Sequence, residues 1–104
     1  MLALYGDRLL ATHINDNMGV SSPEGEISPR DDLHLLPFDG RVDLPHAAHR
    51  MVTCGYRGPL TFELKRNRIE GRRESDRYFD MTTEAFLREA YERALRFRVL
   101  VDGK

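Results

Sequence analysis

Two short runs along this chain are typical of strands, one of them mainly apolar and the other alternating between apolar and polar positions. Residues 9–14, LLATHI, form an apolar run of the length of a buried strand. In residues 60–64, LTFEL, the side chains at 60, 62 and 64 fall on one side of an extended backbone and Thr61 and Glu63 on the other. The pattern predicts a strand in each run.

Two further stretches have the apolar spacing of helices. The first begins at Asp43, a typical N-cap, carries Pro45 in its first turn, and ends before Gly55, where a C′ glycine is expected. The second is capped by Thr82 or Thr83. Both carry apolar residues at helical intervals, at Leu44, Ala47, Ala48, Met51 and Val52 in the first, and at Phe86, Leu87, Ala90, Tyr91, Ala94 and Leu95 in the second.

The order strand, helix, strand, helix predicts an α/β protein with parallel strands. Long polar connections, residues 15–42 and 65–80, follow the two strands, and loops of such length are usually functional or disordered. Two β/α units cannot close a barrel, so both strands are expected to keep an open edge through which the chain could associate with itself.

Composition narrows the classes of partner. The 104 residues are enough for one domain, 1–104, and a net charge of −1 gives no reason to expect a nucleic acid or a membrane. The lone Cys54 favours a reducing compartment. Asp7 and Arg8 interrupt any N-terminal apolar run of secretory length, and no stretch is long enough to span a bilayer, so we expect a soluble cytoplasmic protein.

The candidate chemistry lies where the predicted strands end. His13 and Glu63 occupy the C-terminal ends of the two strands, where ligands gather in parallel α/β sheets, and neighbouring strands would let them share one metal ion. An imidazole with a carboxylate suits Mn, Co, Zn or Fe better than Ca. Either residue alone is more often structural than a ligand. A further motif, DDLHLLPFDG, places Asp32 and His34 two residues apart, either to reach one ion or anion, or to cap and close a turn.

The segments HINDN, DDLHLLPFDG, GYRGPLTFEL and TTEAFLREAYERAL, in this order, resemble the C-terminal part of the xylose isomerase-like TIM barrels, in particular the sugar phosphate isomerases and epimerases. The resemblance implies a partial (β/α)8 TIM barrel of about two C-terminal β/α units, hence a C-terminal fragment, because such barrels have around 250 residues. It implies that His13 and Glu63 bind a divalent ion (Mn, Co, Zn or Mg) and that Glu63 also moves protons. The other two metal ligands of the family have no counterpart here.

The same resemblance implies a small sugar or sugar phosphate as substrate, with proton transfer through a metal-stabilised enediolate. Asp16, Asn17 and His34 would line the pocket, and Arg41 could meet a phosphate, whereas Lys65, Arg66 and Arg68 are expected to be a solvated charge run. With ligands missing, the chain alone is expected to have little or no activity. The sugar, and the choice between isomerisation and epimerisation, stay open.

Two alternatives stand beside this interpretation. AP endonucleases of the same superfamily, which bind three zinc ions, have motifs that His13, Asp32, His34 and Glu63 would also match, but the near-neutral charge is unfavourable for binding a DNA backbone. The other alternative is a non-catalytic, truncated remnant.

Overall fold

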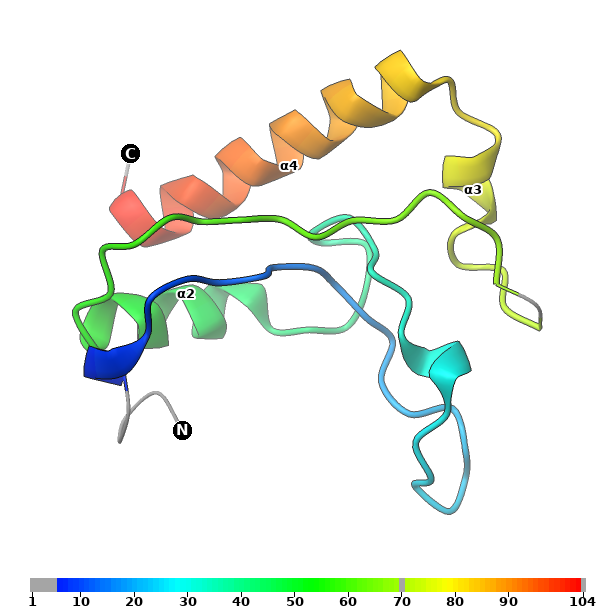
Figure 1. Ribbon diagram of the computed structural model, residues 1–104, viewed down its shortest axis with the longest axis horizontal. Helices are drawn as coiled ribbons and strands as arrows, with labels where there is room; N and C mark the ends of the chain where they lie inside the picture. The colour runs from blue at the N-terminus through cyan, green and yellow to red at the C-terminus, as the bar shows by residue number, and fades with distance from the viewer. Residues whose placement is uncertain (1–5, 70, 104) are drawn as a thin grey trace.

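The computed structural model describes residues 6–69 and 71–103, and its regular structure is helical (Figure 1). Two 3-10 turns, η1 (Gly6–Arg8) and η2 (Pro29–Asp31), lie in the N-terminal third. The α-helices are α2 (Leu44–Thr53), the single-turn α3 (Asp76–Phe79) and α4 (Thr83–Asp102). Helices α2 and α4 pack against each other, and extended segments of chain run alongside them (Figure 1).

The predicted α/β fold is wrong. Within the described residues there is no β-strand and no sheet, only two isolated bridges, a parallel one between Ile14 and Phe62 and an antiparallel one between Asp16 and Leu35. The chain is a small helical domain rather than a partial (β/α)8 TIM barrel.

A change of partner explains why the extended segments form no ladder. The Ile14 N–H donates to the Thr61 carbonyl at 2.7 Å, and the Glu63 N–H donates back to the Ile14 carbonyl at 3.1 Å. Two residues later, Asp16 exchanges both backbone hydrogen bonds with Leu35 instead, each at 2.9 Å. A ladder needs successive pairs with one partner. The strand-like sequence pattern therefore predicted the extended backbone correctly, but it predicted the sheet wrongly.

Helix α2 confirms the expected start and stop signals. The Asp43 side chain accepts the His46 N–H at 3.0 Å, and proline follows in the first turn. Gly55 has φ +79° and donates to the Val52 carbonyl at 3.0 Å, while the Tyr56 N–H reaches the Met51 carbonyl at 3.1 Å. These two bonds form a Schellman motif, which requires a residue that tolerates the left-handed conformation at Gly55.

Helix α4 begins as expected, and Thr82 is its cap, accepting the Ala85 N–H at 3.1 Å. Its buried residues are Phe86 and Phe97, whereas Leu87 and Tyr91, both in the predicted apolar stripe, are exposed. The rest of the described chain therefore covers only part of the predicted apolar stripe. None of the described helices combines the length and apolarity needed to cross a membrane.

The interior is divided into two small apolar clusters. One lies between α2, α4 and the extended segments, and its buried members are Ile14, Leu44, Ala48, Met51, Tyr56 and Phe97. The other joins the segment after η2 to α3 and the first half of α4, and its buried members are Leu33, Leu35, Leu36, Tyr78 and Phe86. The two backbone bridges lie where the extended segments pass these clusters, so packing on both sides fixes the residues at the bridges.

Candidate functional site

The parallel bridge brings His13 and Glu63 together. His13 precedes Ile14 and Glu63 follows Phe62, and the His13 Nδ1 lies 2.5 Å from the Glu63 Oε2. Their side chains are 67% and 43% exposed, so a ligand from solvent could reach both. The predicted proximity of the two residues is therefore found, although no sheet produces it.

His34 extends this contact into the molecule. Its Nδ1 lies 3.1 Å from the Glu63 carbonyl oxygen, 3.4 Å from the Glu63 Oε1 and 3.2 Å from the Asn15 Nδ2. Its Nε2 lies 2.8 Å from the Asp32 Oδ1. His13, Glu63, His34 and Asp32 thus form a continuous row of alternating imidazoles and carboxylates, hereafter the imidazole–carboxylate chain.

The backbone of His34 adopts a conformation that L-residues rarely occupy. Its φ is +51°, and the residue is buried between Leu33 and Leu35, which are fully inaccessible to solvent. Its carbonyl accepts the Lys65 N–H at 3.2 Å. Such a conformation costs energy and persists only where the surroundings fix it, and it is enriched at functional sites. In this conformation the His34 imidazole lies between the side chains of Asp32 and Glu63.

The residues present fit part of a metal site. The His13 Nδ1 and the Glu63 Oε2 are in direct contact, and both are ligand atom types that suit a first-row divalent ion. Across residues 6–69 and 71–103, no three His, Cys, Asp or Glu side chains are grouped closely enough to hold an ion. Catalytic zinc sites usually have three protein ligands. The described residues supply two, so the other positions would need water, substrate or further protein groups.

Asp16 lies outside the imidazole–carboxylate chain. It is fully buried, and its carboxylate accepts the backbone N–H groups of Asn17 at 2.8 Å, Phe38 at 2.9 Å and Val42 at 3.0 Å. These bonds fold residues 38–42 back onto the HINDN segment. Asp16 therefore holds a loop in place in this structure, rather than pointing to a ligand.

Asn17 and Arg41 also serve the local backbone. The Asn17 Oδ1 accepts the Met18 N–H at 2.7 Å and the Gly19 N–H at 3.3 Å, and the Arg41 N–H donates to the Asn17 carbonyl at 2.7 Å. The Arg41 side chain is exposed and makes no hydrogen bond or ion pair within the described part of the chain. Neither residue joins the imidazole–carboxylate chain.

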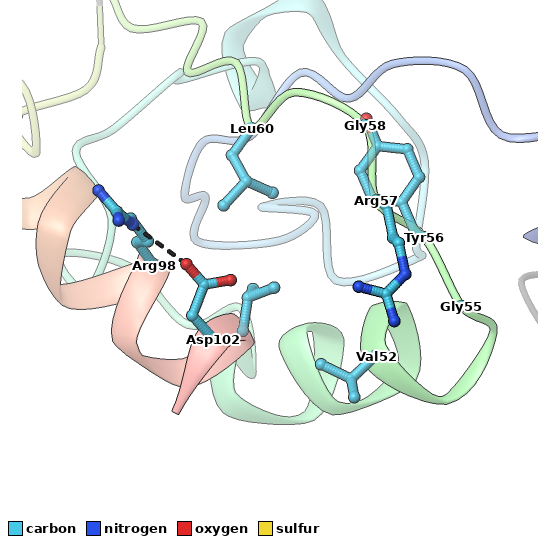
Figure 2. Close-up of a pocket in the computed structure, with 9 residues that line it drawn as sticks. Val52, Gly55, Tyr56, Arg57, Gly58, Leu60, Arg98 and Asp102 are labelled. Atoms are coloured by element: carbon cyan, nitrogen blue, oxygen red, sulfur yellow. Dashed lines mark hydrogen bonds and ion pairs between the residues drawn. The ribbon is translucent and has the colours of Figure 1, made fainter. Parts of the chain in front are cut away.

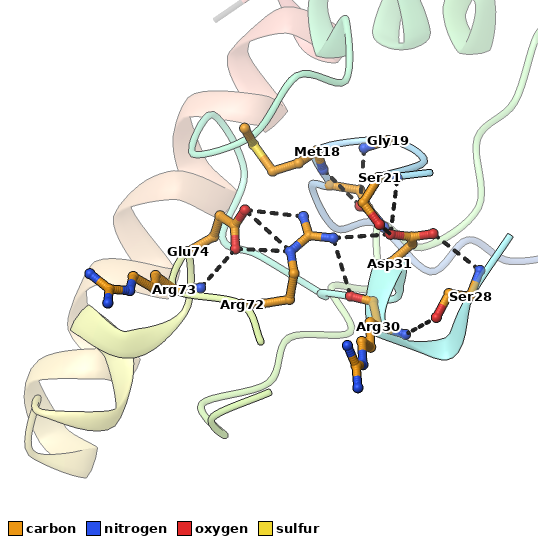
Figure 3. Close-up of polar contacts among 10 residues, drawn as sticks. Met18, Gly19, Ser21, Ser28, Arg30, Asp31, Arg72, Arg73 and Glu74 are labelled. Atoms are coloured by element: carbon orange, nitrogen blue, oxygen red, sulfur yellow. Dashed lines mark hydrogen bonds and ion pairs between the residues drawn. The ribbon is translucent and has the colours of Figure 1, made fainter. Parts of the chain in front are cut away.

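A second polar cluster surrounds Arg72 and fastens the long loop (Figure 3). The Arg72 guanidinium, 10% exposed, donates to Asp31 and to Glu74, each at 3.0 Å. Asp31 also accepts the Ser21 hydroxyl at 2.7 Å and the Ser28 N–H at 3.1 Å. The Ser21 hydroxyl first, then the backbone donors and Arg72, hold the pKa of Asp31 below its ordinary value. The cluster ties the loop before η2 to the segment before α3.

One cavity of the described part of the chain is separate from the imidazole–carboxylate chain. It measures about 720 Å³ and opens between the C-terminal ends of α2 and α4 (Figure 2). Its lining includes Val52, Arg57, Leu60 and the Arg98–Asp102 ion pair, and none of the predicted site residues.

Asn15 is the site residue that the sequence analysis missed. Its amide lies beside His34, on the same side of the extended segment as His13. Positions 13 and 15 share a side because side chains alternate along an extended backbone. The two-residue alternation that separates Glu63 from the apolar residues of its run also places Asn15 on the side of His13. Asn15 could therefore have been predicted as a site residue.

Comparison with known proteins adds one relative. A protein of Sinorhizobium fredii described as uncharacterized protein y4fM is 37% identical to this chain over 101 residues. The match covers 97% of this chain but 26% of the relative, so the chain spans about a quarter of the length of the relative it matches. No family model matches the sequence. No solved structure matches it either.

Proposed function

We propose that this chain contributes the proton-transferring carboxylate of a sugar or sugar phosphate isomerase or epimerase. The observation that carries the proposal is the placement of Glu63, whose two carboxylate oxygens lie 2.5 Å from the His13 imidazole and 3.4 Å from the His34 imidazole. A carboxylate oriented from both sides, yet 43% exposed, is suited to exchange a proton with a bound substrate.

In the proposed reaction, Glu63 takes the proton from a carbon next to a carbonyl, and the electron pair of the broken C–H bond forms the enediolate. In an isomerisation, Glu63 returns the proton to the neighbouring carbon. In an epimerisation, a second acid from outside the described residues, or a water, protonates the same carbon from the opposite face, and Glu63 releases its proton to solvent. His13 and His34 keep the carboxylate in place. Asn15 positions the His34 ring beside it through the contact at 3.2 Å.

The reaction also calls for a divalent ion held by His13 and Glu63, with its remaining ligands supplied from outside the described residues. When bound, such an ion would polarise the carbonyl and the adjacent hydroxyl of the substrate. The ligand types, an imidazole nitrogen and a carboxylate oxygen, suit Mn, Co, Zn or Mg. The cytoplasmic setting predicted from the lone Cys54 belongs to this proposal and is compatible with such a metabolite as substrate.

Exchange of substrate hydrogen with solvent tests the proposal without knowledge of the product. The purified chain and the longer relative would be incubated in D₂O with Mn²⁺ and a panel of aldoses, ketoses and their phosphates, and deuterium at the carbons next to the carbonyl would be followed by NMR. The proposal predicts exchange that Glu63→Gln abolishes and the exposed Glu26→Gln in the loop before η2 leaves unchanged. Absence of exchange with both proteins would contradict it.

A second candidate, a metal-dependent phosphodiesterase, has one observation in its favour. Asp32 and His34, 2.8 Å apart, belong to the same chain of contacts as His13 and Glu63, so four residues of metal-ligating types lie in one row. Cleavage of an abasic-site DNA duplex by the same two proteins, lost on His34→Ala, would favour this candidate over the isomerase.

A further inference from the structure

Helix α4 carries an apolar stripe that the rest of the described chain leaves open. Leu87, Tyr91, Leu95 and Val99 are spaced four residues apart and are 60%, 65%, 38% and 47% exposed. The core-facing side of the helix is marked instead by the buried Phe86 and Phe97. Figure 1 shows α4 along one edge of the molecule, with α2 and the extended segments to one side of it.

The charges beside the stripe are ordered along the helix. Arg88 pairs with Glu84 at 3.2 Å and Arg98 with Asp102 at 3.1 Å, each within the helix. Two exposed residues of opposite charge lie between these pairs. Glu92 is two residues before Ala94 along the helix, and Arg96 is two residues after it. The Arg96 guanidinium stacks on Phe38, 3.9 Å from the ring centroid, which fixes its position beside the stripe.

We propose that the stripe binds α4 of a second copy of this chain in an antiparallel arrangement, with a two-fold axis at the level of Ala94. In this arrangement Tyr91 and Leu95 of each copy pack against the same residues of the other. Glu92 of each copy then lies opposite Arg96 of the other, and the symmetry produces this ion pair twice. A two-fold parallel arrangement would put the Glu92 and Arg96 flanks of the two copies on opposite sides of the interface, where they form no ion pair, so the charges favour the antiparallel one.

The proposed interface is small and its affinity is expected to be low. A single helix face buries less surface than a standard protein interface, which places the dissociation constant on the order of micromolar or weaker. Tyr91 and Leu95, at the centre of the stripe, are expected to dominate the affinity, because energetic residues cluster at interface centres.

Sedimentation equilibrium across micromolar to millimolar concentrations tests the proposal. We expect a reversible dimer whose dissociation constant rises about tenfold or more in Tyr91→Glu and in Leu95→Glu. The control is Leu10→Glu, on the extended segment, where the side chain is 85% exposed. A chain that stays monomeric throughout would overturn the proposal, as would a dimer that Leu10→Glu weakens and the α4 variants do not.

A charge exchange separates the contact from effects on folding. Glu92→Arg and Arg96→Glu each place like charges opposite one another in a homodimer, so each variant alone should dimerise more weakly than the wild type. Mixed together, the two variants restore both ion pairs, and a heterodimer should form at wild-type affinity. Failure of the mixture to associate, with circular dichroism showing both variants folded, would overturn the antiparallel arrangement.

Discussion

The His13 imidazole lies 2.5 Å from the Glu63 carboxylate because one parallel backbone bridge, Ile14 to Phe62, holds two distant segments side by side. The contact does not depend on a sheet. It depends on the packing of Ile14 and Phe62 into the cluster between α2 and α4. The chemistry proposed for Glu63 therefore relies on the stability of a small apolar core and of the loops that enclose it.

Asp16 is expected to be the most important polar residue for stability. In Asp16→Ala, the N–H groups of Asn17, Phe38 and Val42 lose their acceptor, and we expect a loss of about 3 kcal/mol in the free energy of unfolding. Urea denaturation of the variant checks this, with the exposed Asp7→Ala as control. A loss no larger than that of the control would contradict the role assigned to Asp16.

Gly40 is expected to tolerate no side chain. A Cβ at this position would overlap the Asp16 carboxylate and the Asn17 backbone, so Gly40→Ala should cost about 2 kcal/mol by overpacking. At Gly25 a Cβ would meet no atom within 4 Å, and only the φ of +79° opposes substitution, at about 1 kcal/mol. Thermal unfolding compares the two variants. A Gly25→Ala variant less stable than Gly40→Ala would count against this packing.

The Arg72 cluster predicts a loss of stability in acid. Asp31 and Glu74 both have a pKa held below the ordinary value, Asp31 chiefly by the Ser21 hydroxyl and Glu74 chiefly by hydrogen bonds from Arg72. Their folded-state pKa values are depressed, so their contribution is complete above about pH 5 and is lost as the pH falls through the folded-state values. Urea titrations from pH 7 to about pH 3 should show a steeper decline in the wild type than in Asp31→Asn. Parallel curves would refute this.

Tyr78 is expected to join α3 to the loop before α2 through its hydroxyl. That group donates to Asp39 at 2.5 Å and accepts the Leu36 N–H at 3.2 Å, and burial, then the Asp39 bond, raises the pKa of Tyr78. Tyr78→Phe leaves the Leu36 N–H without its acceptor and removes one donor from Asp39, which keeps its ion pair with Arg93 at 2.7 Å, and should cost about 2 kcal/mol by chemical denaturation. At chain concentrations well below those of the proposed α4 dimer, the exposed Tyr91→Phe is the control, and equal effects of the two substitutions would show that the Tyr78 hydroxyl contributes nothing.

Structure that depends on residues close in the sequence was predicted correctly, whereas structure that depends on distant residues was not. Helix α2 was predicted with its cap and its C′ glycine because Asp43 and Gly55 act on backbone groups within a few residues of themselves. The sheet was predicted wrongly because the pairing of an extended segment depends on distant residues. Here the chain beyond Ile14 turns to Leu35 rather than continuing along the segment that holds Phe62.

The candidate site divides in the same way. The proximity of His13 and Glu63 was predicted from the ends of two neighbouring parallel strands; the strands do not form, and one isolated bridge places the two residues together instead. The buried role of Asp16 could not be read from HINDN, since its three donors include N–H groups more than twenty residues away, at Phe38 and Val42. The positive φ of His34 likewise could not be predicted, because histidine adopts that conformation more often than most residues but still in only a small share of positions.

The central claim, that His13 and Glu63 together bind a divalent ion, is tested most directly by isothermal titration of Mn²⁺ or Zn²⁺ into the purified chain. We predict one ion per chain and a fall in affinity of about tenfold or more in both His13→Ala and Glu63→Gln. The exposed His46→Ala and Glu26→Gln should bind as the wild type does. Absence of binding, or binding that the first two substitutions leave unchanged, would contradict the account.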